Sequence, residues 1–305
     1  MNLKSRSTAL VLTGLLAAAL TGCGSSDDAD LVAADPAPSS SSSEPPATTD
    51  TPAEPSDTST TDGGRPGTVA APVYFVGDTP MGPRLSREFR AVESDNPMEE
   101  ALALLVAGDT LDPDYGTLLP AMTVSSVVDD GTTITIDLGA DSTTADKSIS
   151  ESDGALAVQS LVYTLQGITQ SREPVVVPVG GTPTPFLGQP TDTGVEAAPQ
   201  LDVLALVSVT TPETDATVSG TFTASGVASS FEANVPWEVR DGSDTVVLSG
   251  FATADGFGDE LTPWETDVDV SSLDPGSYTF AALTDDPSGG EGPGAFEDTK
   301  TITVE

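Results

Sequence analysis

The stretch that decides the fold of the C-terminal part of this chain reads Phe-Glu-Ala-Asn-Val-Pro-Trp-Glu-Val over residues 231–239. Every second residue, from Phe231 to Val239, is apolar, and polar residues or proline stand between them. Side chains alternate between the two faces of a β-strand, so this period of two predicts a strand with one buried face. We expect Trp237 to anchor the core beneath that face.

Other short runs around this stretch show the same alternation. They begin at Val203, Trp264 and Tyr278, and glycine-containing turn pairs at 241–242, 255–256 and 275–276 separate them. About seven strands in about 100 residues, with no helical pattern, predict an all-β immunoglobulin-like sandwich over residues 203–305. Trp264 is the second expected core anchor.

Residues 69–190 combine strand and helix patterns. Apolar or alternating runs predict strands at 73–76, 85–92, 123–128, 132–138 and 175–179. Two amphipathic helices are expected, one between Asn96 and Gly108 and the other over residues 153–166. Asn96 and Glu99 have the spacing of a capping box, and Gly108 and Gly167 are expected to end the helices. A small sheet with two helices predicts an α+β domain.

The N-terminus carries a targeting signal. A short basic segment precedes an apolar run, residues 9–20, that is too short to span a bilayer comfortably. The run ends at the chain's single cysteine, in the sequence Leu20, Thr21, Gly22 and Cys23. These residues resemble a lipobox, which implies a lipoprotein signal peptide over 1–22 and acyl chains, such as palmitate, on Cys23. The alternative is an ordinary signal peptide with an incidental cysteine.

Two polar segments separate the signal from the domains and the domains from each other. Residues 23–68 consist mainly of Ser, Thr, Pro, Asp, Glu and Ala, with too few large apolar residues to form a core. We expect a disordered tether that holds the domains about 35–40 Å or more from the lipid anchor. Residues 191–202 are expected to be a short linker.

Both domains carry family resemblances. In the first, the sequence pieces are 73–76, 85–90, 103–105, 118–120, 157–165 and 187–190. Taken in this order, they resemble a GerMN domain, a family of sporulation, germination and envelope proteins. The resemblance implies ligand binding or assembly without catalysis.

In the second domain, residues 231–239 carry the most specific signal, and they are accompanied by 216–220, Phe222, 276–280 and 298–304. These residues resemble the immunoglobulin-like domain of bacterial spore germination, which follows GerMN domains. This resemblance implies an extracytoplasmic binding or adhesion module.

Composition excludes several kinds of function. The chain has 48 acidic and 10 basic residues, a formal charge of −38, no histidine and one cysteine. The charge disfavours binding to nucleic acid. Without histidine there is no Ser-His-Asp triad, Cys-His pair or histidine metal site, and one cysteine forms neither an internal disulfide nor a zinc site. We expect no catalytic residue, no metal and no cofactor.

Two sets of charged residues are candidate sites. Arg84, Arg87 and Arg90 form the one concentrated positive stretch and are candidates for an anion contact. Intramolecular pairing with Glu88, Glu93 or Glu99 is the favoured alternative, because a strand points Arg87 away from the other two arginines. Acidic clusters at 255–260 and at Asp285, Asp286, Glu291, Glu297 and Asp298 suggest calcium, but they lack the spacing of a calcium loop.

The sequence therefore predicts a non-enzymatic lipoprotein on the extracytoplasmic face of the cell membrane. We expect it to act as a binding or assembly module that contacts peptidoglycan or an envelope protein. One alternative is an accessory regulator of an envelope sensor or wall hydrolase. Another is a carboxylate-dependent glycan hydrolase, although no particular pair of carboxylates is indicated.

Overall fold

The computed structural model describes residues 67–142, 149–286, 291–292 and 294–305, which all belong to one unit comprising residues 59–305. The expected signal peptide, the lipobox with Cys23 and nearly all of the tether lie outside the described residues. Thr68, which we assigned to the tether, is the first residue of a strand. Within the described ranges, no helix is both long and apolar enough to cross a membrane.

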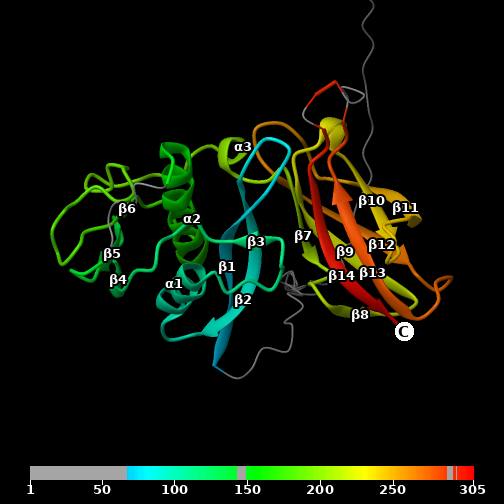
Figure 1. Ribbon diagram of the computed structural model, residues 1–305, viewed down its shortest axis with the longest axis horizontal. Coiled ribbons are helices and arrows are strands. Elements are labelled where there is room, and N and C mark those ends of the chain that lie inside the picture. Colours follow the sequence, from blue (N-terminus) through cyan, green and yellow to red (C-terminus); the bar gives the residue numbers. More distant parts are fainter. Residues whose placement is uncertain (1–66, 143–148, 287–290, 293) are drawn as a thin grey trace, which may run out of the picture. The chain divides into compact units, whose positions relative to one another are not determined.

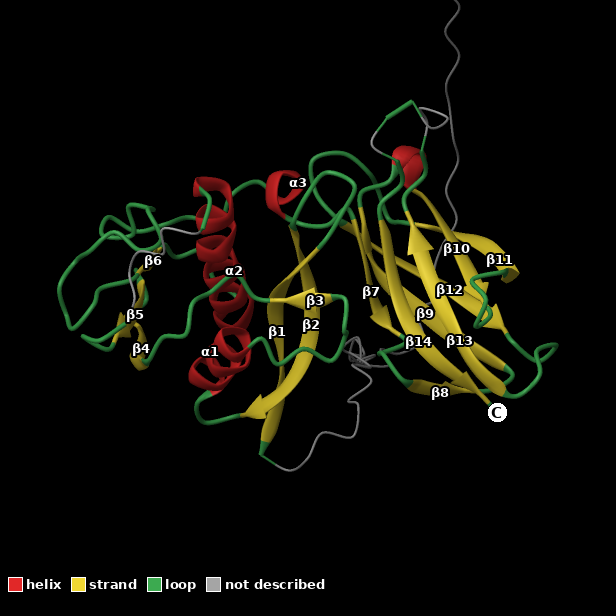
Figure 2. Ribbon diagram, viewed as in Figure 1, coloured by secondary structure: helices red, strands yellow, loops and turns green. Residues whose placement is uncertain are grey.

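In the first domain, two helices lie between two small sheets (Figures 1 and 2). One sheet has the strand order β2-β1-β3 and the other β4-β5-β6. The elements are β1 (Thr68–Gly77), β2 (Arg84–Glu93), α1 (Pro97–Ala107), β3 (Tyr115–Gly116), β4 (Val124–Asp129), β5 (Ile134–Leu138), α2 (Glu151–Thr169) and β6 (Val175–Val176). Residues from both helices and from both sheets form one apolar core.

Helix α2 is buried on nearly every side because it lies between the sheets. Its residues from Leu156 to Gln166 are all buried, so the expected single apolar face underestimates its burial. Gly167 does not end the helix as predicted. A Cβ at this position would lie 2.7 Å from Cγ of Pro72, so the glycine lets β1 approach the helix closely. The helix continues to Thr169.

Helix α1 begins and ends where the sequence predicts, but its expected capping box is absent. The Asn96 side chain makes no capping hydrogen bond. Instead, the Glu100 carboxylate accepts a hydrogen bond from the backbone N–H of Glu93, at 2.7 Å. Gly108 ends the helix with φ of 62°, in the left-handed region that glycine adopts without strain.

The second domain is a β-sandwich of a five-stranded and a three-stranded sheet (Figure 2). The strand orders are β11-β10-β13-β14-β8 and β12-β9-β7. The elements are α3 (Gln200–Val203), β7 (Val207–Thr211), β8 (Ala216–Val218), β9 (Thr221–Ala228), the 3-10 turn η1 (Phe231–Ala233), β10 (Asn234–Arg240), β11 (Val246–Thr253), β12 (Thr262–Asp269), β13 (Gly276–Leu283) and β14 (Glu297–Val304). The predicted fold class, an α+β domain followed by an immunoglobulin-like sandwich, is confirmed.

The stretch 231–239 forms a shorter strand than its alternation predicts. Phe231 lies in the turn η1 and is about half exposed, and the strand starts only at Asn234. Val235 and Val239 are fully buried, whereas Trp237 is half-buried and lies over Gly250 of β11. The run beginning at Val203 is also shorter than predicted, because residues 200–203 form α3 and the strand begins at Val207.

Trp264 meets the expectation of a core anchor. It is 2% exposed, and its ring lies against Gly226 of the neighbouring strand β9. Each tryptophan therefore lies opposite a glycine, and that glycine leaves the space for the indole ring. A residue larger than glycine at position 226 would clash with the backbone oxygen of Ser208 as well, because its Cβ would lie 2.0 Å away.

Candidate functional site

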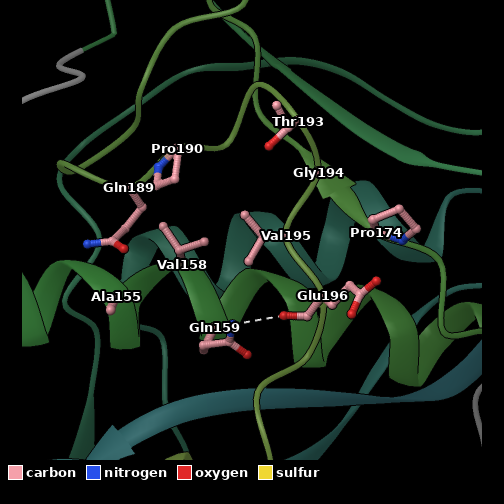
Figure 3. Close-up of a pocket in the computed structure, with 10 residues that line it drawn as sticks. All are labelled: Ala155, Val158, Gln159, Pro174, Gln189, Pro190, Thr193, Gly194, Val195 and Glu196. Carbon is pink, nitrogen blue, oxygen red and sulfur yellow. Dashed lines mark hydrogen bonds between the residues drawn. The ribbon is translucent and has the colours of Figure 1, made fainter.

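A pocket with a volume of about 510 Å³ lies beside the N-terminal half of α2 (Figure 3). The chain from Gln189 to Glu196 forms its other wall. Gln159 fixes this wall to the helix, since its side-chain amide donates to the backbone oxygen of Glu196 at 3.0 Å and its amide oxygen accepts from the N–H of Ala198 at 2.9 Å. Residues 191–202, expected to be a linker, thus pack along α2.

The chemistry of this pocket is mainly neutral. Val158, Val195 and two prolines contribute apolar surface, and Glu196 is the acidic residue among those that line it. No second titratable side chain faces Glu196 across the described lining. The pocket therefore has the volume of a small-molecule site but no acid–base pair.

A second hollow, which we call the arginine groove, has a volume of about 290 Å³. It is lined by the C-terminal end of α2, by β1 and β2 and by α3, with contributions from the second domain. Its principal polar residues are Tyr74, Arg87, Tyr163, Arg172 and Gln200. Arg87 and Tyr74 are direct cross-strand partners on the sheet face opposite Val73 and Phe75.

Tyr163 forms the floor of this groove together with Tyr74. The two rings lie 5.3 Å apart, and the Tyr163 hydroxyl donates to the backbone oxygen of Ala198 at 2.6 Å. Burial, and secondarily Tyr74, raise the pKa of Tyr163 to about 12, while the charge of Arg172 acts in the opposite direction. Tyr163 is therefore a neutral hydrogen-bonding group near neutral pH.

The three arginines that the sequence grouped lie in separate environments. Arg84 Nη1 donates to the backbone oxygen of Leu201 at 2.7 Å. Arg87 lines the groove and donates to Thr210 Oγ1 at 3.3 Å. Arg90 makes ion pairs with Glu88 and Asp109 at 3.5 and 3.7 Å, so for Arg90 the pairing interpretation is right.

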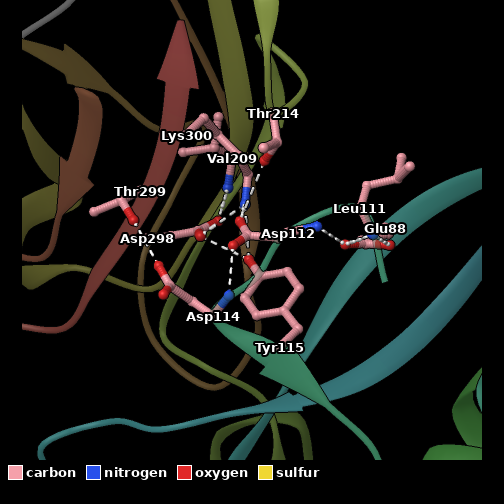
Figure 4. A network of polar contacts seen from close by, with 10 residues as sticks. All are labelled: Glu88, Leu111, Asp112, Asp114, Tyr115, Val209, Thr214, Asp298, Thr299 and Lys300. Carbon is pink, nitrogen blue, oxygen red and sulfur yellow. Dashed lines mark hydrogen bonds and ion pairs between the residues drawn. The ribbon is translucent and has the colours of Figure 1, made fainter. Parts of the chain in front are cut away.

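A buried cluster of charged side chains lies where the two domains meet, in what we call the Lys300 network: Lys300, Asp112, Asp298 and Tyr115 (Figure 4). Lys300 Nζ lies 2.5 Å from Asp112 Oδ2, 2.9 Å from Asp298 Oδ1 and 2.9 Å from the Tyr115 hydroxyl. The Tyr115 hydroxyl donates to Asp298 at 2.6 Å, and the backbone N–H of Val209 donates to the other Asp298 oxygen at 2.6 Å. Asp112 and Tyr115 come from the first domain, and the other members come from the second.

Burial and charge together set the protonation of this network. Lys300, Asp112 and Asp298 are each at most 6% exposed. Burial alone would lower the pKa of Lys300, but Asp298 and Asp112 outweigh it and raise that pKa above its ordinary value. Burial and Asp298 raise the pKa of Tyr115 well above 10.0, so the phenol stays protonated. The network is therefore a charged, hydrogen-bonded junction between the domains.

This network was not predicted from the sequence, although the alternation in β14 contains a signal for it. In the run Asp298-Thr299-Lys300-Thr301-Ile302-Thr303-Val304, the period of two places Asp298 and Lys300 on the same face as Ile302 and Val304. Two charges on a buried face imply that they pair. Asp298 forms an ion pair with Lys300 and does not belong to a calcium cluster. Among the described residues, no group of three or more acidic or cysteine side chains has an arrangement that holds a metal ion.

Two protein families match this chain. Residues 72–185 match a family described as "Sporulation and spore germination", and residues 206–291 match the "Immunoglobulin-like domain of bacterial spore germination". The chain contains both of these domains. Both resemblances drawn from the sequence are thereby confirmed, and neither family description names an enzyme activity.

Solved structures resemble parts of the chain. The tandem GerMN domains of the sporulation protein GerM from Bacillus subtilis are 16% identical over 68% of this chain and 63% of that one, with a TM-score of 0.34. A putative lipoprotein from Clostridium perfringens is 16% identical over 40% of this chain and 81% of that one, with a TM-score of 0.27. An engineered protein is 22% identical over 38% of this chain and 22% of that one, with a TM-score of 0.26. The chain thus spans less than two thirds of the GerM structure and about a fifth of the engineered protein. A comparison with curated proteins gives no match.

Proposed function

We propose that this protein is a non-enzymatic binding or assembly module of the cell envelope, attached to the membrane through lipid on Cys23. The tether, residues 23–68, would hold the two germination-type domains away from the lipid. The partner would be peptidoglycan or another envelope protein. The lipobox-like residues Leu20, Thr21 and Gly22 support the anchor, because they precede the chain's single cysteine.

The observation that carries the non-catalytic part of the proposal is the Lys300 network. Lys300 and its two carboxylate partners are buried at the domain junction, where they connect one domain to the other. The side chains of the network hydrogen-bond to one another, and Asp298 also accepts a hydrogen bond from the backbone N–H of Val209. A catalytic acid or base instead needs access to a substrate proton, within about 2.6–3.2 Å. The Lys300 network is therefore suited to holding the domains together rather than to turnover.

A fractionation experiment tests the anchor. In the native host, the wild-type chain should sediment with the membrane, and Cys23→Ser should be released, because it has no thiol to acylate. Ser25→Ala is the matched control, and it should stay with the membrane. Membrane retention of Cys23→Ser would show that lipid on this residue is not the anchor.

A binding assay tests the module. The full chain carrying Cys23→Ser should be retained by purified peptidoglycan, or should capture an envelope protein by cross-linking in the host. Release of soluble sugar fragments from the peptidoglycan would contradict the non-enzymatic assignment. Failure to bind either class of partner would contradict the binding role.

A further inference from the structure

Six basic side chains are described, and they divide into two groups. Arg90, Arg240 and Lys300 make ion pairs with carboxylates. Arg84, Arg87 and Arg172 make none within the described residues. Roughly one residue in six of this chain is acidic, so an arginine without a carboxylate partner is notable. An unpaired guanidinium keeps its capacity to bind an anion that comes from outside the protein.

Two of the three unpaired arginines, Arg87 and Arg172, line the arginine groove. None of the twelve residues that line this groove is Asp or Glu. The other lining side chains include two tyrosines, three glutamines and a serine, which offer neutral hydrogen-bonding groups. By contrast, the larger pocket beside α2 is lined by Glu196 and by no basic residue. The charge of the groove is thus opposite to that of the chain as a whole.

Arg87 is held in place with donors to spare. Its guanidinium lies over the ring of Phe89, 4.7 Å from the centroid, and Nη2 donates to Thr210. Its Nε is buried and has no hydrogen-bond partner within the described part of the chain. A guanidinium has five N–H donors in a planar fork, and such a fork matches the two oxygens of a carboxylate or phosphate. Arg87 is therefore positioned before any ligand arrives.

Arg172 supplies the second cation and is exposed, so it can move to meet a ligand. It follows Gln170, the residue that caps the C-terminus of α2, and lies close enough to affect the ionisation of Tyr163. Two acidic residues interact with residues that line the groove. Glu173 accepts a hydrogen bond from Ser171, and the charge of Asp202 raises the pKa of Tyr163. Neither of these acids lines the groove.

We propose that the arginine groove binds the carboxylate or phosphate group of a small anionic ligand through Arg87 and Arg172. The proposal names the ligand chemistry of the binding module and rests on the proposed function for its biological role. A volume of about 290 Å³ is at the lower end of ligand pockets, so it admits one compact group. The large negative charge of the chain repels anions, but salt screens that repulsion beyond about 8 Å, and the local cations then dominate.

Nuclear magnetic resonance of the arginine Nε–Hε groups tests this proposal. The full chain carrying Cys23→Ser is titrated with inorganic phosphate, and separately with acetate, at constant ionic strength. We expect saturable shifts at Arg87 and Arg172, and none at Arg240, which is already paired with carboxylates. Saturation by phosphate alone or by acetate alone would identify which of the two oxyanions the site prefers.

Substitutions complete the test. Arg87→Gln and Arg172→Gln should each weaken binding of the effective anion at least about tenfold, which corresponds to about 1.4 kcal/mol. Arg240→Gln removes the same charge outside the groove and should change the affinity less than about twofold. Because Arg172 is exposed, Arg172→Gln remains informative even if Arg87→Gln fails to fold. Absence of a saturable shift at both arginines, or an equal loss in Arg240→Gln, would overturn the proposal. Peptidoglycan retention is measured separately, so loss of anion binding alone would leave the proposed function standing.

Discussion

The two domains meet at two groups of basic side chains, and these groups differ in their partners. Lys300 lies within 3 Å of two carboxylates and a phenol and is 5% exposed. Arg87 and Arg172 line a hollow without a single carboxylate, and Arg172 is exposed. The buried Lys300 is thus neutralised by two carboxylates, whereas the two arginines of the groove have no ion pair within the described residues.

The physical reason is the cost of desolvation. A buried ammonium loses its hydration, and only close opposite charges and hydrogen bonds compensate for that loss. The exposed Arg172 keeps its water, and Arg87 has a hydroxyl and an aromatic ring as neighbours in place of a carboxylate.

Lys300→Met should lower the free energy of unfolding by about 3–5 kcal/mol, because it leaves two buried carboxylates without their cation. Urea denaturation of the full chain measures the loss. The double variant Lys300→Met with Asp298→Asn should be less destabilised than the single variant. In the double variant the negative charge of Asp298 is removed together with its cation, so one buried carboxylate fewer is left without a partner. A loss below about 1 kcal/mol in the single variant would contradict a structural role for the network.

Stability should also fall at alkaline pH. The pKa of Lys300 in the folded protein lies above its ordinary value of 10.5. Its contribution to stability is therefore fully present below pH 10.5 and is lost as the pH rises through the folded pKa. Tyr115 acts in the same direction above pH 10.0, because its pKa is raised as well. Each group adds a slope of at most about 1.4 kcal/mol per pH unit, and Lys300→Met should show a shallower slope in denaturation measured between pH 9 and 12.

Arg87→Met should cost about 1 kcal/mol or less. The variant loses the bond to Thr210 and the contact of a cation with Phe89, but it also removes a buried Nε–H without a partner. Thermal or urea unfolding of both variants compares the loss of unfolding free energy in Arg87→Met with that in Lys300→Met. If the two losses are equal, Arg87 is as structural as Lys300, and the distinction between the two sites fails.

Arg172→Gln should leave the free energy of unfolding within about 0.5 kcal/mol of the wild type, because an exposed side chain without an ion pair contributes little. The same denaturation series provides the measurement. A larger loss would mean that Arg172 supports the C-terminal end of α2, and its role in the groove would have to be reconsidered.

Much of the fold follows from local patterns. Both helices of the first domain and most of its strands occur close to where helical spacing and alternation predict them, and Gly108 ends α1 as expected. In the second domain the predicted runs place β7, β10, β12 and β13, but no predicted run places β9 or β11, and β3 of the first domain was not predicted either. The errors occur where a local rule competes with packing. Gly167 has the appearance of a helix stop, but it serves the close approach of Pro72, and Phe231 continues an alternation but lies in an exposed turn.

The candidate sites were harder to predict for a related reason. The three arginines that are close in sequence, Arg84, Arg87 and Arg90, do not share a site, whereas Arg87 and Arg172 do, although they are far apart in sequence. Proximity along a strand says little about proximity in space, because neighbouring positions face opposite sides of the sheet. The alternation in β14 indicates that Asp298 and Lys300 are buried together, but it does not indicate that Asp112 and Tyr115 meet them.

Residue types and their short-range spacing are enough to predict the limits set by composition, the lipobox-like Cys23, the two domain families and most of the strands and helices. These features depend on residue type and short-range spacing, which are visible along a single chain. Tertiary structure alone decided that Lys300 is neutralised by a carboxylate from the other domain, that α2 is buried between two sheets and that Arg87 and Arg172 share a groove. Each of these features depends on which residues far apart in sequence come together in space. Local spacing along the chain carries no information about such contacts.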